Sequence, residues 1–131
     1  MREILFRGKP RNLKAYGWVH GQLLHHSEKL SKIYSDEIDH PVGVVPETVG
    51  QYTGLTDKNG KKIFEGDIVS VKIGGLKRQG VVFYEDTATR FGLAIGTEKN
   101  FSFLGRQMAK MYEVEVIGNI HDNPDLLEVT E

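Results

Sequence analysis

The chain has 131 residues, 39% of them hydrophobic and 27% charged, which fits one soluble globular domain or one small domain with an extension. No apolar run approaches the roughly 18–20 residues that span a membrane, the N-terminal residues lack the apolar core of a secretion signal, and the absence of cysteine excludes disulfides and thiolate sites. The net charge of −1 is spread unevenly, since basic residues prevail over 1–14 and acidic residues over 113–131. The two ends could pair with each other, within one chain or between copies, could meet phosphate, or could both be solvated.

Short segments of β character follow one another through the first half of the chain. Alternating or β-branched residues predict strands over residues 2–7, 16–24, 42–45 and 48–55. A break follows the first of them at residues 8–12, because Pro10 cannot donate to a strand ladder. The polar segment 25–42 contains Leu30, Ile33 and Tyr34, which mark either one face of a helix or a short strand.

The clearest hairpin signal is the segment TDKNGKK, in which Asn59-Gly60 is the pair favoured by tight turns with positive φ at both central residues. A strand over 63–73 follows, with a break at Gly66-Asp67. There Gly66 is expected to bend the chain, and the Asp67 carboxylate to accept hydrogen bonds from nearby backbone N–H groups. We therefore assign structural turn roles to Asn59, Gly60, Gly66 and Asp67.

The second half continues the β pattern. Val69, Val71 and Ile73 share one face of their strand, and residues 74–79 form the next turn. Further strands are predicted over residues 80–85, 91–95 and 112–120. Short strands at regular spacing with Gly-rich turns, in a chain of 15 glycines, predict a small barrel or sandwich.

Two segments near the C-terminus have helical character. Residues 101–111 are ambiguous between strand and helix, and a helix would place Phe103, Met108 and Met111 on one face. Residues 123–127 are typical of one helical turn, with Asn123 as its N-cap and proline at the first position.

Catalytic and metal-binding patterns are weak. The five histidines lack the spacing of a metal site and are expected at surfaces or strand ends: His20, His25, His26, His40 and His121. Neither Ser27 nor Ser70 has the context of a nucleophile, and acidic groups such as Glu65/Asp67 and Asp36/Glu37/Asp39 are typical of solvated or backbone-bonded carboxylates. Phosphate-binding glycine motifs are missing. The sequence thus indicates no enzyme, no cofactor and no metal.

A nucleic-acid interface has more support. Residues 66–83 form a strand, a basic turn and a second strand, a layout similar to the KOW-like hairpin of SH3-like barrels. The two predicted turns supply six candidate phosphate donors: Lys58, Lys61, Lys62, Lys72, Lys77 and Arg78. Trp18, Tyr84 or Phe91 could stack on bases if exposed. The alternative is that the lysines are solvated turn residues and the aromatic side chains belong to the core.

Three blocks of sequence resemble the YopX family of bacteriophage and prophage proteins: REILFRG at 2–8, GQYTGLTDKNGKKIFEGDIV at 50–69 and EVIGNIHDNPDLL at 115–127. After Phe6-Arg7 the family pattern leads us to expect an aromatic and an acidic residue, where this chain has Gly8-Lys9-Pro10. The resemblance implies a phage-derived protein in the bacterial cytoplasm and a homo-oligomer. It also implies an SH3-like barrel over residues 50–131, after an N-terminal β-containing extension over residues 1–49.

The family carries no activity or cofactor that could be assigned to particular residues. The leading hypothesis is therefore a non-enzymatic β-barrel module that acts through protein contacts, its own copies or a host or phage protein. The alternative is a nucleic-acid-binding barrel that uses the basic turns, and a hydrolytic or metal-dependent enzyme ranks last.

Overall fold

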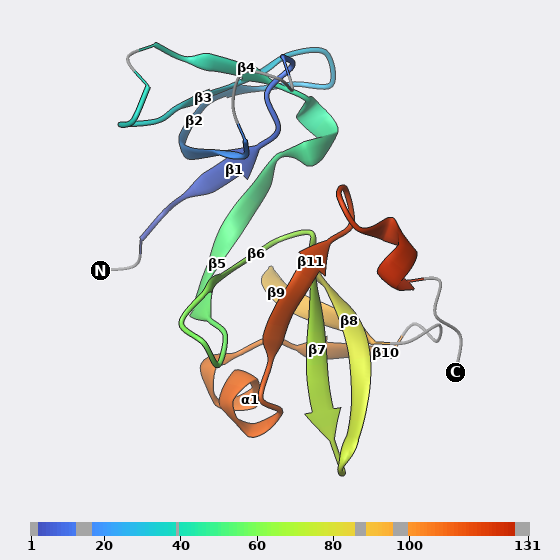
Figure 1. Cartoon of the computed structure of the whole chain (residues 1–131). Helices are drawn as coiled ribbons and strands as arrows, with labels where there is room; N and C mark the ends of the chain where they lie inside the picture. Colours follow the sequence, from blue (N-terminus) through green and yellow to red (C-terminus); the bar gives the residue numbers. More distant parts are fainter. Residues whose placement is uncertain (1–2, 13–16, 39, 86–88, 96–99, 128–131) are drawn as a thin grey trace. The chain divides into compact units, whose positions relative to one another are not determined.

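Short strands make up most of the chain in the computed structural model, which describes residues 3–12, 17–38, 40–85, 89–95 and 100–127 (Figure 1). The chain divides into two compact units, Met1–Tyr52 and Thr53–Glu131, and the division falls within strand β5, Gly50–Thr56. The division of the chain into two domains, 1–49 and 50–131, stays a prediction.

The N-terminal unit is an antiparallel sheet in the order β4-β3-β2-β1, and β1 also pairs with the start of β5. Its elements are β1 Phe6–Gly8, β2 Val19–His26, β3 Ser31–Tyr34, β4 Val42–Val44 and the 3-10 turn η1 Pro46–Thr48. The strand predicted over 2–7 thus forms over 6–8, and the one predicted over 16–24 forms over 19–26. Residue 16 lies outside the described part. The buried core of this unit consists of Val19, Ile33, Val42 and Val44.

Residues 25–42 contain a strand and no helix in their described part. Ser31 and Ile33 are fully buried whereas Lys32 and Tyr34 are exposed, so burial alternates with the period of two that a strand requires. Of the two alternatives that the sequence leaves open, the strand is confirmed.

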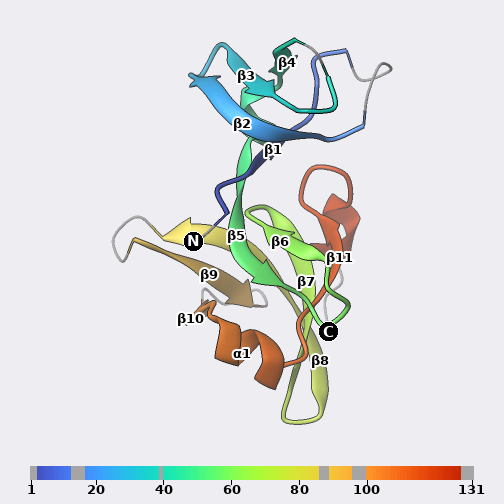
Figure 2. The same ribbon diagram turned by 90° about the vertical axis from the view of Figure 1, so that its left-hand side faces the viewer.

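The C-terminal unit contains a five-stranded antiparallel sheet in the order β10-β9-β8-β7-β11, which curls into half a barrel (Figure 2). Its elements are β6 Lys62–Phe64, β7 Asp67–Ile73, β8 Leu76–Glu85, β9 Arg90–Ile95, β10 Asn100–Phe103, α1 Arg106–Met111, β11 Glu115–Asn119 and the 3-10 turn η2 Pro124–Leu127. The short strand β6 pairs with β5. The predicted fold class, mainly β with a small SH3-like barrel, an N-terminal β-rich extension and short helical segments, is confirmed.

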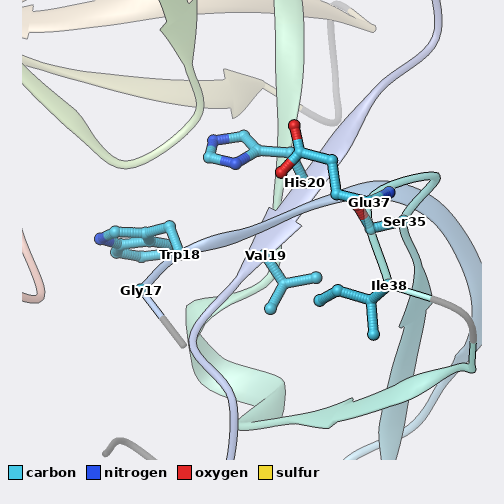
Figure 3. A pocket seen from close by; sticks show the side chains of 7 residues that line it. All are labelled: Gly17, Trp18, Val19, His20, Ser35, Glu37 and Ile38. Carbon is cyan, nitrogen blue, oxygen red and sulfur yellow. The ribbon is translucent and has the colours of Figure 1, made fainter. Parts of the chain in front are cut away.

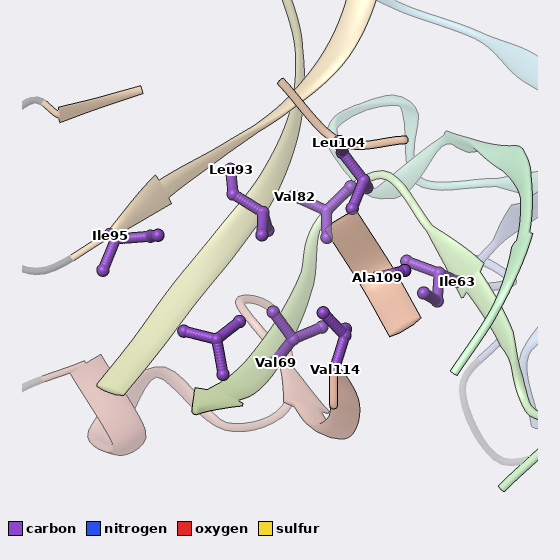
Figure 4. Packing of buried hydrophobic residues seen from close by; sticks show 9 residues of the cluster. Ile63, Val69, Val82, Leu93, Ile95, Leu104, Ala109 and Val114 are labelled. Carbon is purple, nitrogen blue, oxygen red and sulfur yellow. The ribbon is translucent and has the colours of Figure 1, made fainter. Parts of the chain in front are cut away.

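One apolar face of the curled sheet forms the core of this unit (Figure 4). Its fully or almost fully buried members are Ile63, Val69, Val71, Val82, Leu93, Ile95, Leu104, Ala109 and Val114. Ile73 packs against this cluster, so the predicted common face of Val69, Val71 and Ile73 is confirmed.

The β7–β8 hairpin is tighter than predicted. Ile73 pairs directly with Leu76, which leaves Gly74 and Gly75 as a two-residue turn with φ +58° and +83°. Two successive left-handed residues twist in the sense of the flanking strands, and glycine adopts them without the steric cost of a Cβ atom. The prediction of a six-residue turn over 74–79 is therefore wrong.

The β5–β6 hairpin also differs in its turn type. Gly60 has φ +84°, as predicted, but Asn59 is not among the residues with positive φ. The N–H of Gly60 donates to the carbonyl of Asp57 at 3.0 Å, and the N–H of Asp57 donates to the carbonyl of Lys61 at 2.8 Å. These bonds define a three-residue loop in which an ordinary turn precedes one left-handed glycine.

The C-terminal predictions are confirmed in part. The ambiguous segment 101–111 contains the end of β10 and helix α1; Met108 packs against the core, Met111 is exposed, and the side chain of Phe103 lies outside the described part. The strand predicted over 112–120 begins only at Glu115, because Glu113 has φ +49° and cannot continue a ladder.

Candidate functional site

The six candidate phosphate donors all lie in the C-terminal unit, and all are exposed: Lys58, Lys61, Lys62, Lys72, Lys77 and Arg78. The first group, Lys58, Lys61 and Lys62, lies on the β5–β6 turn and the start of β6. The second group, Lys72, Lys77 and Arg78, lies in the β7–β8 hairpin. Lys77 and Arg78 belong to β8 and not to the turn.

Strand register separates the members of the second group. Lys72 lies directly opposite Lys77, so these two side chains share one face of the hairpin. Arg78 lies opposite Val71, which is fully buried, so its side chain starts from the other face. The structure thus brings two lysines together and sets the arginine apart.

Lys58 is compensated by an acidic neighbour. Its Nζ lies 3.4 Å from Oε1 of Glu115, and its backbone N–H donates to the carbonyl of Val114 at 2.9 Å. Glu113, also exposed, stands one residue before this carbonyl in the chain. Acidic side chains at the start of β11 therefore lower the positive potential that the β5–β6 turn could offer to phosphate.

Asp57 joins the β5–β6 turn to β11. The residue is only 7% exposed, and one carboxylate oxygen accepts from the N–H groups of Asn59 and Lys61, both at 2.9 Å. The other oxygen accepts from the N–H of Val116 at 2.9 Å. Burial by itself raises the pKa of Asp57, but the hydrogen bonds from Val116, Lys61 and Asn59 and the charge of Lys61 outweigh it and hold the pKa below its ordinary value.

The Gly66-Asp67 break has the expected structural role. Gly66 has φ +92°, its N–H donates to the carbonyl of Val82 at 2.8 Å, and its carbonyl accepts from Ile120 at 2.9 Å. Asp67 is almost fully buried and its Oδ2 accepts from the N–H of Phe64 at 2.7 Å. The predicted backbone hydrogen bond of the Asp67 carboxylate is confirmed.

The C-terminal turn folds back onto β11 at Gly118. A Cβ atom on Gly118 would lie 2.6 Å from Oδ1 of Asn123 and 3.0 Å from Cδ1 of Leu126. Oδ1 of Asn123 accepts from the N–H of Asn119 at 3.2 Å. The side chain of Asn123 thus ties the start of η2 to the preceding strand, whereas its role as an N-cap stays a prediction.

A pocket of about 350 Å³ lies in the N-terminal unit, lined in part by Trp18, His20 and Glu37 (Figure 3). The guanidinium of Arg7 stands 4.6 Å and the ammonium of Lys9 5.7 Å from the centroid of the Trp18 ring. Arg7 is buried, so this basic residue of the N-terminal segment packs on an aromatic ring and is not presented to phosphate.

The other two candidate stacking residues contact each other. The rings of Tyr84 and Phe91 meet edge to face, with centroids 5.3 Å apart and planes at 74°. Phe91 packs against the core while Tyr84 is partly exposed. Stacking of bases on Tyr84 stays a prediction.

The histidines and acidic residues of the described part of the chain do not gather into a metal-binding cluster. There, no three His, Asp or Glu side chains come close enough together to hold a metal ion, and Asp39 lies outside this part. Nδ1 of His26 lies 2.7 Å from Oγ of Ser31, but Ser31 is fully buried and its hydroxyl is out of reach of a substrate. No helix within the described ranges has the length and apolar character to cross a membrane.

Comparison with known protein families identifies a match over nearly the whole chain. A family model described as YopX protein matches residues 5–128, nearly the whole chain. The match includes most of the first sequence block and both of the others. No curated protein matches the chain significantly.

Proposed function

Because the chain belongs to the YopX family, we propose that it is an accessory protein of a bacteriophage or prophage, active in the cytoplasm of the bacterial host. In this proposal the protein is not an enzyme. Its barrel unit acts through protein contacts, and its partners include other copies of the same chain.

The observation that carries this proposal is a pair of exposed apolar side chains in the C-terminal unit. Met111 and Leu76, 67% and 64% exposed, are the two most exposed large apolar residues of the described chain. Met111 ends α1, Leu76 follows the β7–β8 turn, and the bond from the N–H of Lys72 to the carbonyl of Tyr112, 2.8 Å long, ties these two elements together. Grouped apolar side chains on a surface favour a contact with another protein.

Nucleic-acid binding is the alternative, favoured by the cross-strand pair of Lys72 and Lys77. Two ammonium groups on one face suit two phosphates. The pairing of Lys58 with Glu115 and the burial of Arg7 both weaken this alternative.

Light scattering at micromolar concentration tests the protein-contact proposal. We expect a mass well above the 14.8 kDa of one chain. Leu76→Glu combined with Met111→Glu should reduce it to that of one chain, because a carboxylate buried in an apolar contact is costly. Leu24→Glu, at an exposed apolar residue of the N-terminal unit, is the matched control and should leave the mass unchanged. A single-chain mass for the unmodified protein, with no host protein retained in a pull-down, would contradict the proposal.

Binding to single- and double-stranded DNA and RNA across a salt series tests the alternative. We expect no binding even at low salt, and a pull-down from host lysate that does not change on nuclease treatment. If binding is seen, the alternative predicts that Lys77→Ala with Arg78→Ala lowers the salt slope by about one to two units, roughly one for each phosphate contact.

A further inference from the structure

The pocket of the N-terminal unit has the composition of a small-molecule site. Its volume is about 350 Å³, and its lining includes an indole ring, an imidazole, a hydroxyl and a carboxylate, those of Trp18, His20, Ser35 and Glu37 (Figure 3). Ligand sites in proteins combine an apolar wall with a few polar groups in a hollow of this size. An aromatic wall favours an organic ligand with a flat ring.

Two segments form the pocket, and local structure holds them in place. Trp18 and His20 lie two residues apart at the start of β2, so their side chains leave the chain on the same side. The opposite wall is the turn after β3, in which the N–H of Ile38 donates to the carbonyl of Ser35 at 3.1 Å. This turn lies directly on β2, because a Cβ atom on Gly21 would come within 3.0 Å of Cα of Ser35. The pocket is therefore formed before any ligand binds.

The hydroxyl of Ser35 indicates that a hydrogen-bond acceptor belongs in the pocket. Ser35 is only 6% exposed, and its hydroxyl oxygen accepts from the backbone N–H of Glu37 at 3.3 Å. Within the described part of the chain, no group accepts the hydrogen of this hydroxyl. A buried donor without an acceptor is costly, and an acceptor atom of a ligand would satisfy it.

The charged groups at the pocket restrict the ligand further. Glu37 is exposed, and an ionised carboxylate only accepts hydrogen bonds. Trp18 lies apart from Glu37 in Figure 3, and the ammonium of Lys9 stands 5.7 Å from the centroid of its ring. A fitting ligand thus presents N–H donors to the carboxylate, an acceptor to Ser35 and negative charge to Lys9.

The base guanine has this pattern of donors and acceptors. Its N1–H and N2 amino group lie side by side and can donate to both oxygens of one carboxylate, and its O6 accepts. Adenine would place a ring nitrogen lone pair against the carboxylate, and uracil offers a single N–H between two carbonyl groups. Bases that proteins recognise by these edges also pack on aromatic side chains.

We propose that this pocket binds a guanine mononucleotide. Glu37 accepts from the N1–H and the amino group of the base, Ser35 donates to an acceptor of the base, and Trp18 forms the apolar wall beside the ring. Lys9 meets the phosphate. This site goes beyond the proposed function and does not depend on self-assembly.

Isothermal titration calorimetry with the four ribonucleoside monophosphates tests the proposal. Guanosine monophosphate should bind with a dissociation constant below about 1 mM, at least about tenfold more tightly than the adenosine, cytidine and uridine monophosphates, because only guanine gives the carboxylate two hydrogen bonds. Trp18 is the only tryptophan of the chain, so a saturable change of its fluorescence at the same concentrations locates the nucleotide in this pocket.

Glu37→Gln should weaken the binding of guanosine monophosphate about tenfold and remove the preference over adenosine monophosphate. The control is Glu28→Gln, at an exposed carboxylate of the same unit that does not line this pocket, and it should bind like the unmodified protein. Far-UV circular dichroism checks that both variants are folded. Equal affinities for the four nucleotides, no saturable binding of guanosine monophosphate at about 1 mM, or an unchanged affinity in Glu37→Gln would overturn the proposal.

A short single-stranded RNA with one guanine separates a free nucleotide from a base within a chain. The RNA should bind more weakly than guanosine monophosphate, because a pocket of about 350 Å³ has room for a single nucleotide. Binding of the RNA as tightly as the mononucleotide, or more tightly, would overturn the proposal in favour of a nucleic-acid site. Light scattering tests self-assembly separately, so either proposal can fail without the other.

Discussion

Replacing Asp57 with alanine is expected to lower the free energy of unfolding of the C-terminal unit by about 4 kcal/mol. The change leaves three backbone N–H groups, those of Asn59, Lys61 and Val116, without the carboxylate that accepts from them. Hydrogen bonds to a charged acceptor contribute about 1.5–3 kcal/mol each, and partial access of water to the turn reduces the sum. The measurement is urea unfolding at neutral pH, followed by amide hydrogen exchange in β7, β8 and β11.

The same variant should show a distinct pH dependence. The pKa of Asp57 lies below the ordinary value of 3.8 for an aspartate. The ionised carboxylate therefore stabilises the folded state fully at pH values above the ordinary pKa, and this contribution is lost as the pH falls through the lowered pKa of the folded state. The stability gap between the unmodified protein and Asp57→Ala should therefore narrow below pH 4. Asp125→Ala, at an exposed carboxylate in η2, is the control and should change stability by less than about 0.5 kcal/mol. A loss below about 1 kcal/mol for Asp57→Ala would contradict the role of the carboxylate.

The contacts of Asp57 also show which part of the structure could not be predicted from the sequence. The hairpin was predicted from Asn59-Gly60, a local signal, and the hairpin exists. The bond from Asp57 to Val116 joins residues 59 apart, and no local pattern distinguishes an aspartate that reaches a distant strand from one that is solvated. The same carboxylate also accepts from the N–H of Asn59 within the turn, which explains why Asn59 lacks the predicted positive φ.

The predicted length of the β7–β8 turn is wrong for a different reason. The pair Gly74-Gly75 is itself a signal for a two-residue turn with positive φ at both positions, and the structure follows it. The polar residues after it suggested a longer loop, but Lys77 lies on the outer face of β8, where a charged residue fits a strand as well as a turn. Polarity alone does not separate these two cases.

The candidate site was less predictable than the fold. Sequence indicates which residues carry charge, but their pairing depends on contacts between distant segments, as with Lys58 and Glu115. The exposed pair of Leu76 and Met111 was missed because apolar residues in a strand and a helix are expected in the core. Only the position of each residue at the end of its element could have indicated exposure.

Two of the three sequence blocks that resemble the YopX family meet in the structure of the C-terminal unit. The central block contributes Asp57 and Gly66, and the C-terminal block contributes Val116 and Ile120, which bond to them. Gly118, in the C-terminal block, is required because Asn123 and Leu126 lie against it. These bonds hold β11 and the residue after it against the β5–β6 turn and the start of β7, so the two blocks have a structural role in this unit.

Gly21→Ala is the second prediction with a large effect, and it concerns the N-terminal unit. A Cβ atom at this position would overlap the backbone carbonyl oxygen of Tyr34 and come within 3.0 Å of Cα of Ser35. Backbone atoms cannot move aside as the end of a flexible side chain can, so we expect a loss of about 3 kcal/mol in the free energy of unfolding. Fluorescence of Trp18, the only tryptophan of the chain, follows the unfolding of this unit.

Gly43→Ala is the matched control for this variant, because its Cβ would meet only Cδ of Arg11, at 3.8 Å, and it should cost less than about 1 kcal/mol. The pair of variants also tests whether the two units are separate domains. If they are, Gly21→Ala leaves amide protection in β7 and β8 unchanged, and Asp57→Ala leaves the Trp18 transition unchanged. Loss of protection in both units with either variant would show that the chain unfolds as one cooperative domain, because a local defect then lowers the stability of every residue equally.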